Sequence, residues 1–136
     1  MKVFLAVLSL GLFTFFSLNY SAGSIFSAFE SPGHVSPAEF KEYLDNEEGV
    51  LLDIRTPEEY GQERLAGSVL LNIYDETNFR SEAAKLDRSE PVFVYCRSST
   101  RSRRALDILE SLGFEVVVGL EGGINAWKNA GFSIIR

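Results

Sequence analysis

The sequence is poor in cysteine and histidine, with one of each among its 136 residues. A single cysteine, Cys96, excludes an intrachain disulfide, so the fold must be held together by its core. Cys96 and His34 are also too few to supply the nitrogen and sulfur ligands of a zinc site. We therefore expect neither a resident metal nor a cofactor.

Basic residues are scarce as well: 13 lysines and arginines face 19 acidic residues, and the formal net charge is -6 at pH 7. Such a chain lacks the broad basic face that neutralises phosphates, which argues against nonspecific nucleic-acid binding. Its hydrophobic content of 46% and charged content of 24% are typical of a globular protein. The length suits one domain.

The start of the chain lacks acidic residues, the first being Glu30. One cation, Lys2, precedes an apolar run over Val3–Leu18, and small residues follow. This is the plan of a secretory signal peptide, and the run is shorter than the roughly 20 residues of a membrane span. An uncleaved anchor is the alternative.

These features divide the chain into three parts. We predict a signal peptide over residues 1–23, with cleavage near Ala22 or Gly23, a leader over 24–33 and one domain over 34–136. The mature protein would then lie outside the cytoplasm, and we expect it in the periplasm.

Short apolar stretches alternate with helical patterns along the predicted domain. We predict a strand near His34 and others at 50–54, 68–73, 92–95, 114–119 and 132–135. The helical patterns cover 36–46, 56–62, 78–87, 102–113 and 122–131. This alternation indicates an α/β fold with a parallel sheet covered by helices on both faces, and such sheets bind ligands at the carboxyl ends of their strands.

Two of the helices have a clear starting signal. Ser36 and Thr56 are each followed by proline, and Glu39 and Glu59 lie three residues after them. A hydroxyl residue and a glutamate at this spacing form a capping box, and proline costs nothing at the first helical position.

The stretch VFVYCRSSTRSRRAL, residues 92–106, carries the candidate chemistry. Cys96 ends an apolar strand, and a short polar loop leads from it into a helix N-terminus, where free N–H groups and the helix dipole favour an anion. The loop can therefore stabilise a thiolate at Cys96 and bind an anionic substrate. The candidate substrate-binding residues are Arg97, Ser98, Ser99, Thr100, Arg101 and Ser102.

Plainer interpretations exist for the same residues. Cys96 could be a small buried hydrophobic residue, and Arg103 and Arg104 could solvate a helix face, with Asp107 pairing Arg103 four residues away. A dyad of Cys96 with His34 is possible in principle. His34 is far away in sequence, so we favour chemistry that a thiolate performs without a base.

Transfer of a sulfur atom is such a reaction, because thiolate attack on a sulfane sulfur expels a stable anion such as sulfite. A phosphatase also uses a thiolate in an anion-binding loop, usually with cysteine, five residues and then arginine. Here Arg101 is already the fifth residue after Cys96, so the loop is too short for that signature.

Three separated segments resemble one known family, the single-domain rhodaneses, which are sulfurtransferases. They are LLDIRTPEEYGQERLAGSVLLNI at 51–73, CRSSTRS at 96–102 and GFEVVVGLEGGINAWKNAG at 113–131. The likeness runs from about Val35 to the C-terminus.

The resemblance implies an α/β fold with a five-stranded parallel sheet and a persulfide carried on Cys96. It implies that the loop wraps the transferred sulfur, with Arg97 and Arg101 meeting an anionic donor. Asp53 and Arg55 match a structural ion pair near the loop.

Trp127 matches a core aromatic residue of the same family. Two positions depart from the pattern. Ser99 stands where the family often has glycine, which would strain Ser99 if that position needs a positive φ, and Arg64 stands where histidine is usual.

We therefore expect an exported sulfurtransferase that moves sulfur from thiosulfate, or a related donor, through Cys96 to a thiophilic acceptor such as cyanide or a thiol. Its expected partners are that small anionic donor, the acceptor, and a thiol reductant or sulfur-acceptor protein; we expect a monomer that binds no nucleic acid. The alternatives are a non-catalytic rhodanese-like module for binding or redox sensing, and a cysteine-dependent phosphatase or arsenate reductase.

Overall fold

The computed structural model describes residues 31–136. The predicted signal peptide and most of the predicted leader lie outside these residues. The strands are β1 (Gly33–Val35), β2 (Val50–Asp53), β3 (Val69–Leu70), β4 (Val92–Tyr95) and β5 (Val117–Leu120). The helices are α1 (Pro37–Asn46), α2 (Pro57–Gln62), α3 (Glu76–Ala83), α4 (Thr100–Ser111) and α5 (Gly123–Asn129).

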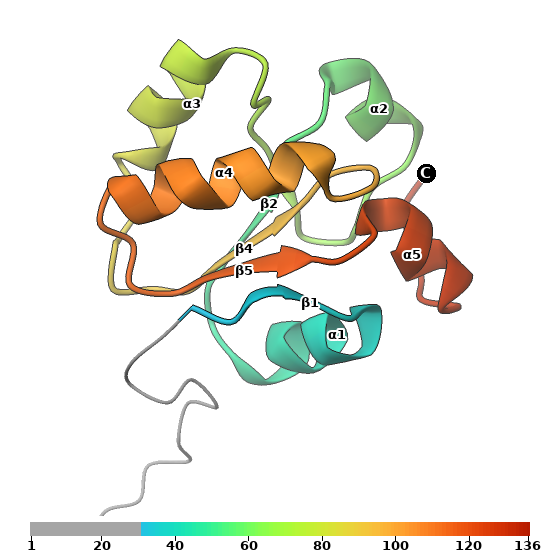
Figure 1. The fold of residues 1–136 in the computed structure, drawn as a ribbon. Coiled ribbons are helices and arrows are strands. Elements are labelled where there is room, and N and C mark those ends of the chain that lie inside the picture. The colour runs from blue at the N-terminus through green and yellow to red at the C-terminus, as the bar shows by residue number, and fades with distance from the viewer. Residues whose placement is uncertain (1–30) are drawn as a thin grey trace, which may run out of the picture.

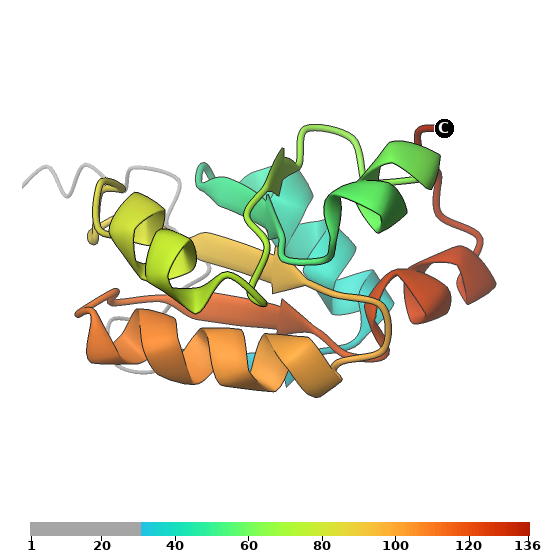
Figure 2. The same cartoon turned by 90° about the horizontal axis from the view of Figure 1, so that it is seen from above.

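The five strands form one parallel sheet, as predicted, and their order in this sheet is β1-β5-β4-β2-β3. In both views of the ribbon the strand arrowheads point toward α2 and α5, so the loops that follow the strands gather at that end (Figures 1 and 2). This end is where parallel α/β sheets bind their ligands.

Helices cover both faces of the sheet, with α4 on one side and α1 on the other (Figure 1). On one face Phe79 of α3 and Leu109 of α4 pack with Val94. On the other face Phe40 of α1 and Trp127 of α5 belong to the cluster that holds Phe93 and Tyr95 of β4. All four residues of β4 are buried, which explains its unbroken apolar sequence.

The aromatic residues of the second face lock α5 onto the sheet. Trp127 is 4% exposed, lies edge-on to Phe40 and packs against Phe132, and its Nε1–H donates to the carbonyl of Ser133 at 2.9 Å. The predicted core role of Trp127 is therefore confirmed. Full burial of a large apolar side chain contributes about 1.5–3 kcal/mol.

Both predicted capping boxes are present. The hydroxyls of Ser36 and Thr56 accept the backbone N–H of Glu39 and Glu59, whose carboxylates return to the capping residues. Helix α4 ends in a glycine, because Gly113 adopts a φ of +90° directly after the C-cap residue Leu112.

Several predicted boundaries were wrong. Residues 132–135 form no strand, and Ile135 makes only an isolated antiparallel bridge with Arg64. The strand at 68–73 shrinks to Val69–Leu70, because β3 is an edge strand that pairs with β2 alone. The strand predicted at 114–119 begins only at Val117.

The helix predicted at 78–87 runs instead from Glu76 to Ala83. It begins two residues earlier because Asp75 caps it, accepting the N–H of Asn78 at 3.1 Å.

Within residues 31–136, none of the helices combines the length and apolar character that crossing a membrane would require.

Candidate active site

Cys96 lies where β4 ends, and the loop from Cys96 to Ser102, here called the sulfur loop, starts from it. The residue is 1% exposed and shares an apolar cluster with Val94 and Ala105. The backbone N–H of Ser99 donates to its Sγ at 3.2 Å. The thiol is therefore buried, as the plainer interpretation expected, and yet it receives a donor of the kind that stabilises a thiolate.

Ser99 has a φ of +87°, the one positive φ outside glycine in residues 31–136. The strain anticipated for serine at this position is present, and it costs about 1–2 kcal/mol. Two contacts hold the conformation. Ser99 Oγ accepts the N–H of Gly122 at 2.6 Å, and the hydroxyl of Ser102 donates to the Ser99 carbonyl at 2.9 Å.

Two carbonyls of the sulfur loop are bound by α5. The N–H of Ile124 donates to the Cys96 carbonyl at 2.9 Å, and the N–H of Asn125 donates to the Arg97 carbonyl at 3.3 Å. Gly123 makes this approach possible, because a Cβ there would lie 2.4 Å from the Cys96 oxygen.

The loop amides, in contrast, are left available. Within residues 31–136 no hydrogen-bond acceptor is found for the backbone N–H groups of Arg97, Ser98, Thr100, Arg101 and Ser102. The last three belong to the first turn of α4, where intrahelical acceptors do not exist. Backbone N–H groups at a helix start next to a thiol form a site suited to an anion.

The two loop arginines occupy different environments. Arg101 lies in the first turn of α4 rather than in an open loop, and its side chain is 16% exposed. Its two terminal nitrogens donate to the carboxylate of Glu59 at 2.7 and 2.8 Å, and its guanidinium lies over the ring of Tyr74. Arg97 is exposed and has no ion pair or hydrogen bond from its side chain to any described residue.

Glu59 is a site residue that the sequence reasoning missed. Its capping role was predicted, but the same carboxylate also neutralises Arg101. The hydrogen bonds from Arg101 lower the pKa of Glu59 to about 2, so it is ionised at neutral pH. No local signal in the sequence distinguishes a glutamate with two partners from one that only caps.

Asp53 and Arg55 form the ion pair that the resemblance implied. The pair is buried, with Nη2 of Arg55 2.6 Å from the Asp53 carboxylate. Tyr95 donates its hydroxyl to Asp53 at 2.5 Å and accepts the N–H of Leu65 at 3.1 Å. Burial, reinforced by the Asp53 charge, raises the pKa of Tyr95, which keeps the hydroxyl protonated.

Arg55 extends this network by donating to the carbonyl of Glu63 at 2.6 Å. The network therefore joins the ends of β2 and β4 to the segment after α2. Removing one partner of a buried pair costs about 3–5 kcal/mol, so these residues support the site structurally.

His34 lies on β1, where the sequence placed it, and it contacts the sulfur loop through Ser102 instead of pairing with Cys96. Its Nε2 is 2.7 Å from Ser102 Oγ. The Ser102 hydroxyl donates to Ser99, so His34 must be the donor in this contact. Burial lowers the pKa of His34 below its usual value, which makes it neutral at pH 7.

Arg103 and Arg104 lie on the exposed face of α4, as the plainer interpretation held. Their partners differ from the prediction, because Arg103 lies 3.4 Å from Glu121 rather than pairing with Asp107. Arg104 pairs with Glu76 of α3. At the other departure from the family pattern, Arg64 lies over the ring of Tyr60.

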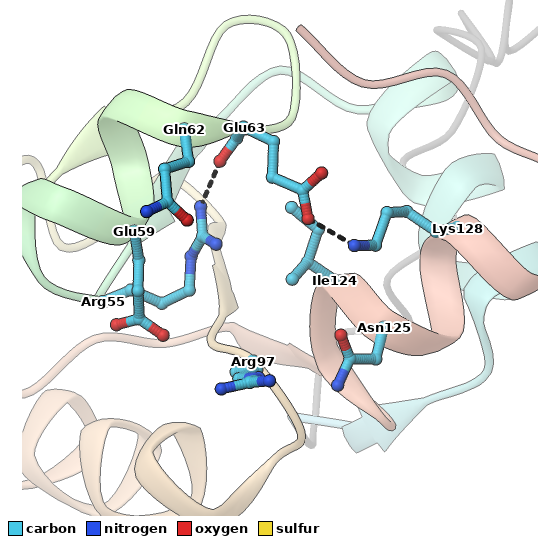
Figure 3. A pocket seen from close by; sticks show the side chains of 8 residues that line it. All are labelled: Arg55, Glu59, Gln62, Glu63, Arg97, Ile124, Asn125 and Lys128. Carbon is cyan, nitrogen blue, oxygen red and sulfur yellow. Dashed lines mark hydrogen bonds and ion pairs between the residues drawn. The ribbon is translucent and has the colours of Figure 1, made fainter. Parts of the chain in front are cut away.

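A cavity of about 160 Å³ adjoins the sulfur loop (Figure 3). It lies between α2 and α5. Its lining residues are Arg55, Glu59, Gln62, Glu63, Arg97, Ile124, Asn125 and Lys128. No cluster of histidine, cysteine and carboxylate side chains within residues 31–136 could hold a metal ion.

The fold and the sulfur loop together define an α/β domain with a buried cysteine at the carboxyl end of β4, in a loop whose geometry suits an anion. The family model for the rhodanese-like domain matches residues 36–130. The chain therefore belongs to the rhodanese-like sulfurtransferase family.

The individual relatives agree with this assignment. The chain is 33% identical to the thiosulfate sulfurtransferase GlpE of Pseudoalteromonas translucida, over 71% of this chain and 90% of that protein. It is 38% identical to a sulfurtransferase of Allochromatium vinosum, over 67% and 82% of the two chains. The crystal structure of a rhodanese-related protein from Thermoplasma volcanium superimposes with a TM-score of 0.65 at 27% identity, over 75% and 96%.

Other relatives are longer than this chain. It spans 55% of an uncharacterized Synechocystis protein at 31% identity, and 30% of a tRNA uridine(34) hydroxylase of Cytophaga hutchinsonii at 32% identity. The domain thus occurs in proteins named for different reactions.

Proposed function

We propose that the protein is an exported sulfurtransferase that carries sulfur from thiosulfate, or a related sulfane donor, to a thiophilic acceptor as a persulfide on Cys96. One observation carries the proposal. The chain's single cysteine receives the Ser99 N–H at 3.2 Å in a loop whose other amides have no acceptor within residues 31–136.

In the first half-reaction the Cys96 thiolate attacks the outer sulfur of thiosulfate. A bond forms between Sγ and that sulfur, the sulfur–sulfur bond of thiosulfate breaks, and its electron pair leaves with sulfite. Sulfite is a stable anion and needs no general acid, which suits a site where His34 is bound to Ser102. The unpaired guanidinium of Arg97 would attract the dianion.

In the second half-reaction the acceptor attacks the outer sulfur of the persulfide. The Sγ–S bond breaks and its electron pair returns to Sγ, so that cyanide would leave as thiocyanate. A negative charge is present on the attacking thiolate and again on the persulfide, and the loop amides are placed to stabilise it at both stages.

The geometry disfavours a phosphatase or an arsenate reductase. In such enzymes the loop arginine holds the oxyanion with its paired N–H groups, whereas both terminal nitrogens of Arg101 are occupied by Glu59. A purely binding module would have no use for a donor aimed at Sγ.

The test follows the mass of the purified protein. Thiosulfate should add one sulfur atom, and cyanide should then remove it and release thiocyanate. Cys96→Ser should do neither, because its hydroxyl is not ionised at neutral pH, and an unchanged melting temperature would show that this variant is folded. Efficient cleavage of an aryl phosphate without sulfur uptake would replace the proposal with a phosphatase, and neither activity would indicate a binding module.

A further inference from the structure

The cavity beside the sulfur loop has one charge left without a partner. Among its ionised lining residues, Arg55 pairs with Asp53, and Glu59 pairs with Arg101. Glu63 pairs with Lys128 (Figure 3). Only Arg97 lacks a side-chain partner among the described residues of this cavity, so the cavity offers a ligand a net positive charge.

Two neutral side chains complete the free polar groups of the cavity. Gln62 of α2 and Asn125 of α5 bring their amides to it, and Asn125 lies next to Arg97 because its N–H binds the Arg97 carbonyl. A guanidinium with two nearby amides suits a carboxylate or a sulfonate. An ammonium group would need Glu59 or Glu63, and both would first have to release their own cations.

The suitability of the cavity for an anionic group applies to the sulfur acceptor as well as to the donor, because both must reach Cys96. In the proposed reaction the donor leaves before the acceptor arrives, and both must reach the same sulfur. Cys96 is 1% exposed, and the residue after it, Arg97, opens onto the cavity. The acceptor therefore meets the same unpaired cation that received the donor.

We propose that this cavity is a subsite for the acidic group of the sulfur acceptor, and that the acceptor is a small thiol bearing a carboxylate or sulfonate. The inference rests on the proposed sulfurtransferase function. The sulfur of the acceptor thiol bonds to the outer sulfur of the Cys96 persulfide, and the Sγ–S bond breaks with its electron pair on Sγ. The thiol proton passes to the new persulfide, which the acceptor carries away. Arg97 offsets the repulsion between an acidic acceptor and the anionic site.

The experiment compares three thiols on protein loaded with thiosulfate, freed of excess donor and checked for the added sulfur by mass. The acceptors are 3-mercaptopropionate, 2-mercaptoethanol and cysteamine, compared at equal thiolate concentration. We expect the rate constant of persulfide loss to be about tenfold higher for the anionic thiol than for the neutral one, and lowest for the cationic thiol.

Arg97→Gln should abolish the difference between the anionic and the neutral thiol, so that the ratio of their rates falls from about tenfold to about one. Arg104→Gln is the matched control, since it removes the same charge from the exposed face of α4 and should change none of the three rates. Equal wild-type rates for the three thiols, or an equal loss on all three in Arg97→Gln, would overturn the inference.

Binding without turnover separates this inference from the proposed function. Titration of resting protein with 3-mercaptopropionate should raise its melting temperature, and Arg97→Gln should abolish the rise. If this binding occurs and thiosulfate adds no sulfur, the proposed function fails and the subsite stands. If sulfur is loaded and no binding occurs, the subsite is wrong and the proposed function stands.

Discussion

Arg101 and Glu59 join α2 to α4 at the edge of the sulfur loop. Both terminal nitrogens of the guanidinium are engaged, and the carboxylate also accepts the N–H of Thr56 at 3.0 Å. One acidic side chain therefore fixes a helix start and the direction of a loop arginine. This leaves Arg97 as the loop arginine that is free to meet a substrate.

The pKa of Glu59 predicts how stability depends on pH. Arg101 lowers this pKa from the usual 4.5 to about 2 in the folded protein. The ionised carboxylate therefore contributes stability above about pH 4.5, and this contribution is lost as the pH falls through about 2. Glu59→Gln should melt at a lower temperature than wild type at pH 7, and the difference should shrink as the pH approaches 2.

Thermal melts at a series of pH values provide the measurement. Glu58→Gln is the control, because it removes a charge from the same turn of α2 without breaking an ion pair, and its effect should be much smaller. A Glu59→Gln difference that stays constant down to pH 2 would contradict the assignment.

The roles of single residues were only partly predictable from the sequence. The positions of Cys96 and the strained Ser99 followed from the order of strand, loop and helix and from the family pattern. The sequence did not predict that Arg101 is held in an ion pair while Arg97 is left without one. This difference depends on Glu59, which is 42 residues from Arg101 in sequence. The contact of His34 with Ser102 spans 68 residues and has no local signature.

At the scale of elements, the docking of α5 on the sulfur loop depends on Gly123. A Cβ there would lie 2.4 Å from the backbone of Arg97 and of Cys96, and φ is +58°. Backbone atoms cannot yield as a flexible side chain can, so Gly123→Ala should cost about 1–3 kcal/mol of unfolding free energy and slow sulfur loading.

Gly61→Ala is the matched control, because nothing lies within 4 Å of its Cβ position and the residue is helical. It should stabilise the protein by about 0.5–1 kcal/mol and leave loading unchanged. Denaturant midpoints and loading rates measure both effects. Equal behaviour of the two variants would mean that α5 does not position the loop.

Helix starts were easier to predict than strand ends. Capping boxes are local, and the ones at Ser36 and Thr56 were confirmed. A strand requires a partner, which an apolar pattern does not supply, and so residues 132–135 remain outside the sheet. The number of strands and their parallel direction followed from the family resemblance, whereas the order of the strands was not predicted.

At the scale of the whole molecule, the prediction of export depends on the sequence of residues 1–23, which lie outside the described residues. The pattern from Lys2 to Leu18 motivates the prediction. Protein from an extracytoplasmic fraction should begin near Gly23 or Ser24 when its N-terminus is sequenced, because the signal peptidase cleaves after small residues. A variant lacking residues 2–23 should stay in the cytosol, and full-length wild-type protein found there would contradict the prediction.

The near-complete burial of Cys96 also restricts the size of the molecules that can react with its sulfur. A sulfur that is 1% exposed favours slender molecules such as thiosulfate, cyanide and short thiols over a thiol on the flat surface of another folded protein. In an oxidising compartment this geometry spares the cysteine from mixed disulfides with bulky neighbours. Hydrogen peroxide is small enough to reach the sulfur, so Cys96 stays susceptible to oxidation by small peroxides.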